Sequence, residues 1–221
     1  MSLRRHGGLL FFSMYQLQLQ DRDLEMLTPL VHCYRITTSA AEAARLNVSV
    51  STTSKRLSKL TAAGFLVRLS ALMSTLPPIQ KRLCKWAPGD PDPNTGAIAY
   101  AAQKRWHDRP LKKTTIYTAS KKLLTYFGLP PRPHIKTLHA SHDYGVLQCY
   151  EFCRQKFPSC DFVGEDMFAP RGHGVAVEDA QLVQGDKVFA VVDFIGSYRK
   201  SRVQHLHKEV GLERGLRYLL F

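Results

Sequence analysis

The spacing of hydrophobic residues over the first part of the chain predicts a series of short helices. Leu24, Leu27 and Val31 recur at helical intervals after Asp21, which is placed to cap the helix. Residues 39–42, Ser-Ala-Ala-Glu, have the capping-box pattern, in which the serine oxygen accepts a backbone N–H and the glutamate reaches back. A second, alanine-rich helix is therefore expected to begin there.

A third helix is expected after a three-residue turn. Ser49 can cap it, and Val50, Leu57 and Leu60 then lie on one face. Gly64 follows as a left-handed stop, which only glycine adopts without steric cost. Two helices separated by such a short turn are typical of a helix-turn-helix.

Later segments extend this arrangement to a winged helix-turn-helix. The β-rich stretch 65–73 predicts a strand, 114–118 predicts a returning strand, and 120–127 predicts a helix that packs back on the others. We therefore expect a winged helix-turn-helix domain over residues 1–128. Its wing contains an insertion, residues 74–113, with a Pro/Gly/Asp turn cluster and an alanine-rich helix.

The remainder of the chain predicts a second domain of the α+β class. Prolines in residues 129–137 form an extended linker. The domain over residues 138–221 is expected to contain, in order, a helix at 138–157, strands at 161–168, 175–183 and 187–195, a helix at 201–212 and a strand at 216–221. Its element order is αβββαβ.

The charge distribution separates these two parts. The 221 residues carry a net charge of +13. Residues 1–136 hold 21 Lys and Arg against seven acids, whereas residues 137–221 hold 10 against 11. This asymmetry favours a nucleic-acid-binding part joined to a neutral part with another role, although a merely solvated basic surface would carry the same charge.

Composition narrows the cellular setting. The sequence has no apolar run of the roughly 18 residues that a membrane-spanning helix needs, so we expect no membrane contact. The five cysteines are scattered and odd in number, which favours a cytoplasmic protein over a disulfide scaffold. His139, His142, Cys149 and Cys153 would follow one helical stripe too long for a single zinc ion, so we interpret the cysteines as buried apolar groups.

The basic part offers a surface for double-stranded DNA. Lys and Arg neutralise phosphates, and Ser and Thr hydrogen-bond phosphates or base edges, as a recognition helix in a major groove requires. The alternative is an ordinary amphipathic helix with a solvated side. The candidate DNA-binding residues of the third helix and the wing are Ser51, Thr52, Lys55, Arg56, Lys59, Arg68, Lys112 and Lys113.

The neutral part offers three carboxylates on its expected strands. Glu165 falls in the first strand, Asp179 in the second and Asp193 at the end of the third. If these strands pair, the carboxylates converge at one edge of the sheet and can bind Mg²⁺ through their oxygens. The competing interpretation is that acids simply occupy the solvated face of hairpin strands.

The αβββαβ order with these acids resembles the PD-(D/E)XK, restriction-endonuclease-like core. That resemblance implies a metal-binding Asp on the second strand, matched by Asp179, and a (D/E)-x-K motif on the third, matched only by Asp193. Ile195 occupies the place of the lysine, so Lys200 or Arg202 would have to supply the positive charge that activates water or stabilises the transition state.

Both parts together resemble the replication-relaxation proteins of bacterial plasmids and mobile elements. The motifs that carry the resemblance are Asp21-Arg-Asp-Leu, Leu57-Ser-Lys-Leu-Thr-Ala-Ala-Gly-Phe-Leu66, Ile116-Tyr-Thr leading into Leu123-Leu124, His142-Asp-Tyr-Gly-Val146, Glu165, Val177-Glu-Asp-Ala180 and Asp193-Phe-Ile-Gly-Ser197. The family has Pro-Asp where this chain has Glu178-Asp179.

Three functional hypotheses follow. The leading one is a DNA-binding protein of a plasmid, mobile element or replicon, whose nuclease-like second domain is inactive and whose DNA binding needs no cofactor. The second is a Mg²⁺-dependent DNA endonuclease with Glu165, Asp179 and Asp193 as metal ligands and Lys200 as the basic group of the catalytic site. The third is a transcriptional regulator whose second domain docks a partner or forms a homodimer.

Overall fold

A computed structural model describes residues 17–74, 78–107, 109–132, 135–168 and 178–221. The N-terminal part contains α1 (Asp21–His32), α2 (Ser39–Leu46), α3 (Val50–Ala62), β1 (Leu66–Met73), β3 (Lys112–Ala119) and α5 (Lys121–Tyr126). The insertion contains β2 (Cys84–Trp86) and α4 (Thr95–His107). The C-terminal part contains the helical elements η1 (Thr137–His139), α6 (Ala140–Lys156), η2 (Glu165–Met167), α7 (Lys200–Leu206) and the π-helix η3 (His207–Glu213), with strands β4 (Asp161–Gly164), β5 (Ala180–Gln184), β6 (Lys187–Asp193) and β7 (Tyr218–Leu220).

Local capping signals place the first helices almost where the sequence predicts. The Ser49 hydroxyl accepts the Thr52 N–H at 3.1 Å at the start of α3, and Gly64 has φ +79° after its end. Two expected caps are wrong by one residue. Gln20, not Asp21, precedes α1, and Thr38, not Ser39, caps α2 by accepting the Ala41 N–H at 3.1 Å.

The β1–β3 hairpin lies between α6 and the N-terminal helices. The strands are antiparallel, and Thr37 forms an isolated bridge with Tyr117 of β3. One side of the hairpin, including Tyr117, joins the core of the N-terminal helices. The other side, including Ala71 and Met73, packs on Ala140 of α6. One face of the hairpin is therefore buried near Tyr117 and the other face near its opposite end, at Ala71 and Met73.

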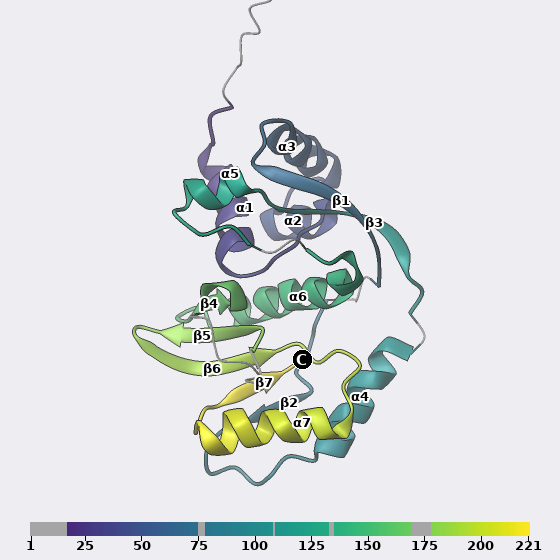
Figure 1. Ribbon diagram of the computed structural model, residues 1–221, viewed down its shortest axis with the longest axis vertical. Helices are drawn as coiled ribbons and strands as arrows, with labels where there is room; N and C mark the ends of the chain where they lie inside the picture. The colour runs from purple at the N-terminus through teal and green to yellow at the C-terminus, as the bar shows by residue number, and fades with distance from the viewer. Residues whose placement is uncertain (1–16, 75–77, 108, 133–134, 169–177) are drawn as a thin grey trace, which may run out of the picture.

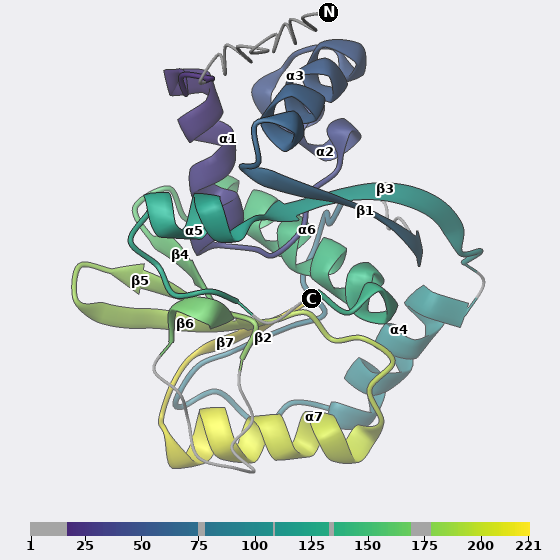
Figure 2. The ribbon, with the colours of Figure 1, turned by 45° about the horizontal axis from the view of Figure 1, so that its top comes forward.

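A five-stranded sheet forms the centre of the other half. Its order is β2-β7-β6-β5-β4, and only the β6–β7 pair is parallel. Helix α6 covers one face and α7 the other (Figures 1 and 2). The final strand is paired on both sides inside the sheet, so the expectation for residues 216–221 is confirmed. The protein is of the α+β class.

The insertion contributes to the sheet, although the sequence assigns it to the wing. Strand β2 pairs with β7, and Ile98, Ala99 and Ala102 of α4 join a core cluster with Val203 of α7. Hydrophobic burial explains this placement, because Trp86 stacks on Tyr218 with ring centroids 5.5 Å apart. The chain therefore leaves the wing, completes the sheet and returns to the wing.

One hydrophobic core runs through both predicted domains. It includes Leu27 and Leu57 from the N-terminal helices together with Leu147 of α6 and Phe221. Because α6 is enclosed on most sides, it shows little amphipathic periodicity. Its Cys149 and Cys153 are buried free thiols within this core.

Two glycines permit the close approaches that join these layers. A Cβ at Gly145 of α6 would lie 2.1 Å from the Phe194 ring, and one at Gly164 would lie 2.5 Å from the Cys33 carbonyl oxygen. The end of β4 thus contacts the backbone after α1 directly. None of the helices in the described parts of the chain has the length and hydropathy needed to cross a membrane.

Candidate functional site

The outer side of α3 presents polar and basic side chains to solvent. Thr53, Leu57 and Leu60 are buried against the N-terminal core. The exposed candidates on the opposite side of the helix are Ser51, Thr52, Lys55 and Lys59. The Thr52 hydroxyl also hydrogen-bonds Ser49 at 2.8 Å, so it belongs partly to the helix cap.

Arg56 differs from the other candidate residues of α3. Its guanidinium forms a two-point ion pair with Asp23 of α1, in which Nε lies 2.5 Å from Oδ1. Asp23 is 1% exposed and also accepts the Gln20 N–H at 2.8 Å. The arrangement joins α3 to α1 through a side chain that is 24% exposed, and a contact of Arg56 with DNA stays a prediction.

The basic residues of the wing lie at its two ends. Arg68 is exposed near the base of β1, opposite Tyr117. Lys112 and Lys113 are exposed at the other end of the hairpin, opposite Met73 and Leu72. The wing therefore offers two separate positive positions rather than one cluster.

The residues that carry the three candidate carboxylates lie at one end of the sheet. Glu165 begins η2 just after β4, and Asp179 lies just before β5; both were expected inside strands. The Glu165 N–H bonds the Asp179 carbonyl oxygen at 2.9 Å. Asp193 ends β6, and the following Phe194 N–H donates to Asp179 Oδ2 at 2.7 Å. Residues 175–177 of the expected second strand lie outside the described residues.

Helix α6 contributes a histidine to this acid cluster. His142 Nε2 lies 3.4 Å from Asp179 Oδ2, and its Nδ1 lies 3.8 Å from Asp143 Oδ1. Burial disfavours the imidazolium, but the hydrogen bonds and charges of Asp143 and Asp179 outweigh burial and raise the pKa of His142 to about 11. The ring is therefore a cation at neutral pH.

Asp193 is the most enclosed acid of the cluster. It is 2% exposed, and its Oδ1 has no hydrogen-bond partner within the described structure. Burial and the charge of Asp179 raise the pKa of Asp193 well above its usual range, while His142 and Arg202 oppose that shift. The direction of the shift follows from burial, because the neutral carboxyl avoids the cost of a buried unpaired charge.

Arg202, rather than Lys200, is the cation that acts on Asp193 from α7. Its guanidinium lies 5.7 Å from the centre of the Tyr198 ring, beside the end of β6. Lys200 is exposed, and its side chain passes α4 instead, where a Cβ at Gly96 would lie 3.9 Å from its Cδ. The sequence pattern favours Lys200 first and Arg202 as the substitute.

Arg35 of the N-terminal half and Arg132 of the expected linker segment close the cluster. Arg35, after α1, places Nη1 2.9 Å from Glu165 Oε1 and Nε 2.9 Å from Asp166 Oδ2. Arg132 places Nε 3.0 Å from Asp166 Oδ2 and donates to the Leu30 carbonyl oxygen at 3.2 Å. Glu165 and Asp166 are thus paired with cations of this chain and joined to the segments that pack on α1.

The space inside the cluster is small. A cavity of about 10 Å³ is lined by Arg35, Arg132, Asp143, Glu165, Asp166 and Asp179, among others. That volume is about what one water molecule requires. Among the described residues, no group of three or more His, Cys, Asp or Glu side chains is arranged to bind a metal ion. The Mg²⁺ site stays a prediction.

Sequence reasoning missed His142, Asp143 and Arg35 as members of the cluster. Arg35 and Glu165 are far apart in the sequence, so nothing in the sequence pattern indicates that they form an ion pair. Glu178, by contrast, faces away and pairs with Arg214 at 3.0 Å. It helps fix the end of η3 to β5.

Glu165 provides a pH test of this arrangement. Burial raises its pKa from 4.5 to about 7; Arg35 opposes that shift, and Asp179, Asp166 and Asp143 add to it. Because the pKa of Glu165 is raised in the folded protein, its protonated form adds to the stability of the fold below about pH 4.5. This added stability is lost as the pH rises to about 7. We expect Glu165→Gln to gain stability relative to wild type across that interval, on the order of 2 kcal/mol.

The measurement is urea unfolding of both proteins between pH 4.5 and 8. Glu213→Gln, which changes an exposed carboxylate at the end of η3, serves as the control and should keep a constant difference. A difference for Glu165→Gln that stays flat or falls with pH would contradict the assignment.

Comparisons with known proteins supply no family. A scan against protein-family models gave no match, and searches of curated proteins and of solved structures gave none either.

Proposed function

We propose that the protein binds double-stranded DNA through α3 and the wing, as an accessory or regulatory protein of a plasmid, mobile element or other replicon. The observation that carries the proposal is the solvent-exposed side of α3, where Ser51, Lys55 and Lys59 stand clear of the core. Helix α2, a short turn at Asn47 and α3 have the spacing of a helix-turn-helix, and the basic wing flanks them.

The second half is proposed to be a nuclease-like module without catalytic activity. Four strands in sequence order with a parallel final pair, and α6 and α7 on opposite faces, support a PD-(D/E)XK-like architecture. The charges around the carboxylates support inactivity. His142 lies between Asp143 and Asp179, where a bound cation would otherwise balance the acids, and Arg35 pairs with Glu165.

A Mg²⁺-dependent endonuclease is the second candidate. The convergence of Glu165, Asp179 and Asp193 at one end of the sheet favours it, with Arg202 as the basic group. For this function, metal binding would have to displace the His142 imidazolium from Asp179 and ionise Asp193, which costs free energy in a buried site. We therefore rank it second.

Lys55→Ala/Lys59→Ala tests DNA binding in the full chain. The slope of log K against log salt falls by about 0.9 for each phosphate that the protein no longer neutralises, so the double variant should bind a 30-base-pair duplex roughly 10–30-fold more weakly near 0.15 M salt. Fluorescence anisotropy in a sodium chloride series measures both quantities. Lys156→Ala/Lys187→Ala, which removes two exposed charges from α6 and β6, is the matched control and should bind as wild type.

The same samples separate the two candidates. With Mg²⁺ or Mn²⁺ added, we expect supercoiled DNA to stay intact. Nicking that disappears in Asp193→Asn would favour the endonuclease. If the wild-type chain fails to bind duplex DNA at low salt, or if the two double variants lose affinity equally, the proposed recognition surface is wrong.

A further inference from the structure

Helix α4 of the insertion has an outer face that the fold does not bury. Ile98, Ala99 and Ala102 point into the core shared with α7. On the opposite side Lys104 is exposed, and Tyr100, one turn before it, is 68% exposed. Burial of one side of the helix thus leaves an aromatic ring and an ammonium group together in solvent.

Side-chain bonds to backbone carbonyls hold α4 in place. Arg105 Nη2 donates to the Ile195 and Phe221 oxygens at 2.5 and 2.9 Å, and Gln103 Nε2 donates to the Tyr198 oxygen at 2.9 Å. These contacts fix the helix to the end of the central sheet. The outer face is therefore preorganised, so binding a ligand there carries no cost of ordering the helix.

Exposed lysines lie on α4 and beside both of its ends. The helix contains no acidic residue, and β3 begins with the exposed Lys112 and Lys113 on its wing side. At its other end Lys200 passes Gly96. Both views show α4 running between the end of the hairpin and α7 (Figures 1 and 2). The wing's charge therefore extends toward the second half of the molecule.

We propose that the outer face of α4, with Tyr100, Lys104 and the adjacent Lys200, is a second contact surface for the backbone of duplex DNA. It rests on the proposed DNA-binding function and extends the contacted DNA beyond the site reached by α3. Lysines neutralise phosphates without regard to sequence, and a tyrosine hydroxyl can hydrogen-bond a phosphate oxygen. The insertion would thereby add length and affinity to the complex rather than base specificity.

Lys104→Ala/Lys200→Ala tests the surface in the full chain. With a 30-base-pair duplex of arbitrary sequence, the slope of log K against log salt should fall by about 2, and affinity near 0.15 M salt should fall roughly 10–30-fold. Lys156→Ala/Lys187→Ala again removes equal charge elsewhere and should change neither quantity. Thermal unfolding of each variant verifies that the fold is unchanged.

Photocrosslinking supplies a readout that net charge does not affect. A photoreactive phenylalanine analogue at Tyr100 should crosslink to labelled duplex. The same analogue at Leu212, which is 57% exposed near the far end of the α7–η3 helix, should not.

The outcomes distinguish this proposal from the one it rests on. If the wild-type protein does not bind duplex DNA at low salt, the proposed function itself is wrong. If wild-type protein binds and Lys55→Ala/Lys59→Ala weakens binding while Lys104→Ala/Lys200→Ala does not, the second surface is refuted and the first stands. Equal losses for the α4 variant and the control pair, or crosslinking from Leu212 as strong as from Tyr100, would also overturn it.

Discussion

Removal of residues 216–221 is expected to abolish cooperative folding. Strand β7 lies between β2 and β6, and Tyr218, Leu219, Leu220 and Phe221 are each at most 1% exposed. The deletion removes an internal strand of the sheet together with several buried side chains, each of which contributes about 1.5–3 kcal/mol. That total is comparable with the roughly 5–15 kcal/mol by which a whole domain is stable.

Circular dichroism during heating measures whether the shortened chain still unfolds cooperatively. We expect residual helix signal, no sigmoidal transition and strong binding of a hydrophobic dye. Tyr218→Phe is the control, because it keeps the buried ring and loses only the 2.9 Å hydrogen bond to His207 Nδ1. It should unfold cooperatively with a loss of about 1 kcal/mol. A deletion variant that unfolds cooperatively would contradict the assigned position of β7.

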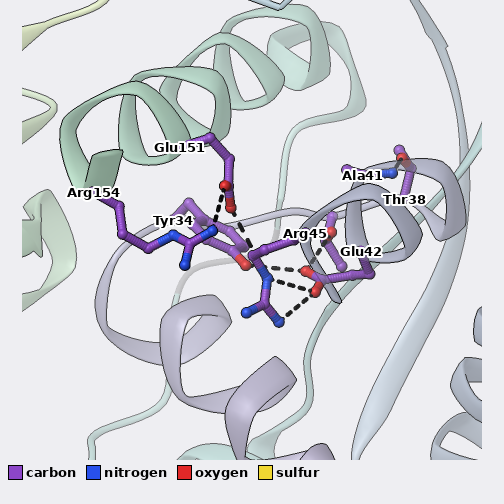
Figure 3. Close-up of polar contacts among 8 residues, drawn as sticks. Tyr34, Thr38, Ala41, Glu42, Arg45, Glu151 and Arg154 are labelled. Carbon is purple, nitrogen blue, oxygen red and sulfur yellow. Dashed lines mark hydrogen bonds and ion pairs between the residues drawn. The ribbon is translucent and has the colours of Figure 1, made fainter. Parts of the chain in front are cut away.

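Glu42→Ala is expected to cause the largest loss of any single polar substitution in the N-terminal half. Figure 3 shows the hydrogen bonds that connect its carboxylate to Tyr34 and Arg45. Oε1 accepts the Tyr34 hydroxyl at 3.0 Å and the Thr37 hydroxyl at 2.7 Å, while Arg45 donates to Oε2 at 2.9 and 2.6 Å. Glu42 is 1% exposed and the Arg45 side chain 6%. Alanine would remove the carboxylate that pairs with a buried guanidinium at two points, and breaking a buried ion pair costs about 3–5 kcal/mol.

A double variant distinguishes loss of the charge pair from general damage. Glu42→Met/Arg45→Met removes both charges and fills the space with apolar atoms, so much of the stability should return. Urea unfolding of the two variants makes the comparison. A loss below about 1 kcal/mol for Glu42→Ala, or no recovery in the double variant, would show that the pair is not the stabilising element.

The same network connects α2 to α6. Arg45 Nε lies 4.0 Å from Glu151 Oε1, and Arg154 lies 3.2 Å from the other Glu151 oxygen (Figure 3). Glu42 therefore has a role that its sequence pattern does not indicate. The Ser-Ala-Ala-Glu pattern predicts a cap, but burial beside Tyr34 and Arg45 determines where the carboxylate goes.

Features set by neighbouring residues could be predicted from the sequence. Ser49 at the start of α3, and Gly64, Gly128 and Gly185 with positive φ after helices or within a hairpin, depend on backbone geometry over a few residues. The enclosed helix α6 could also be predicted, although its exact position within the core could not, because burial on most sides removes the periodicity that indicates a neighbour.

Features that join distant segments could not be predicted. The strands predicted from the sequence place Asp179 and Asp193 near the same end of the sheet. His142 and Arg35 entered the cluster only through contacts between α6, the sheet and the loop after α1. The pairing of β2 with β7 likewise depends on hydrophobic burial of Trp86, which a three-residue strand does not indicate.

The pairing of β2 with β7 also affects how the chain folds during synthesis. Each residue of β2 precedes its partner by more than 130 positions. At about 5–20 residues per second, the ribosome needs roughly 7–27 s to supply that partner. Throughout this interval Trp86 and the apolar side of α4 lack the surface that buries them. Pro88, Pro91 and Pro93, with Asp90 and Asp92 between them, lie directly after β2. Prolines and charges beside a hydrophobic strand suppress intermolecular pairing, so this turn protects the nascent chain against aggregation until β7 is made.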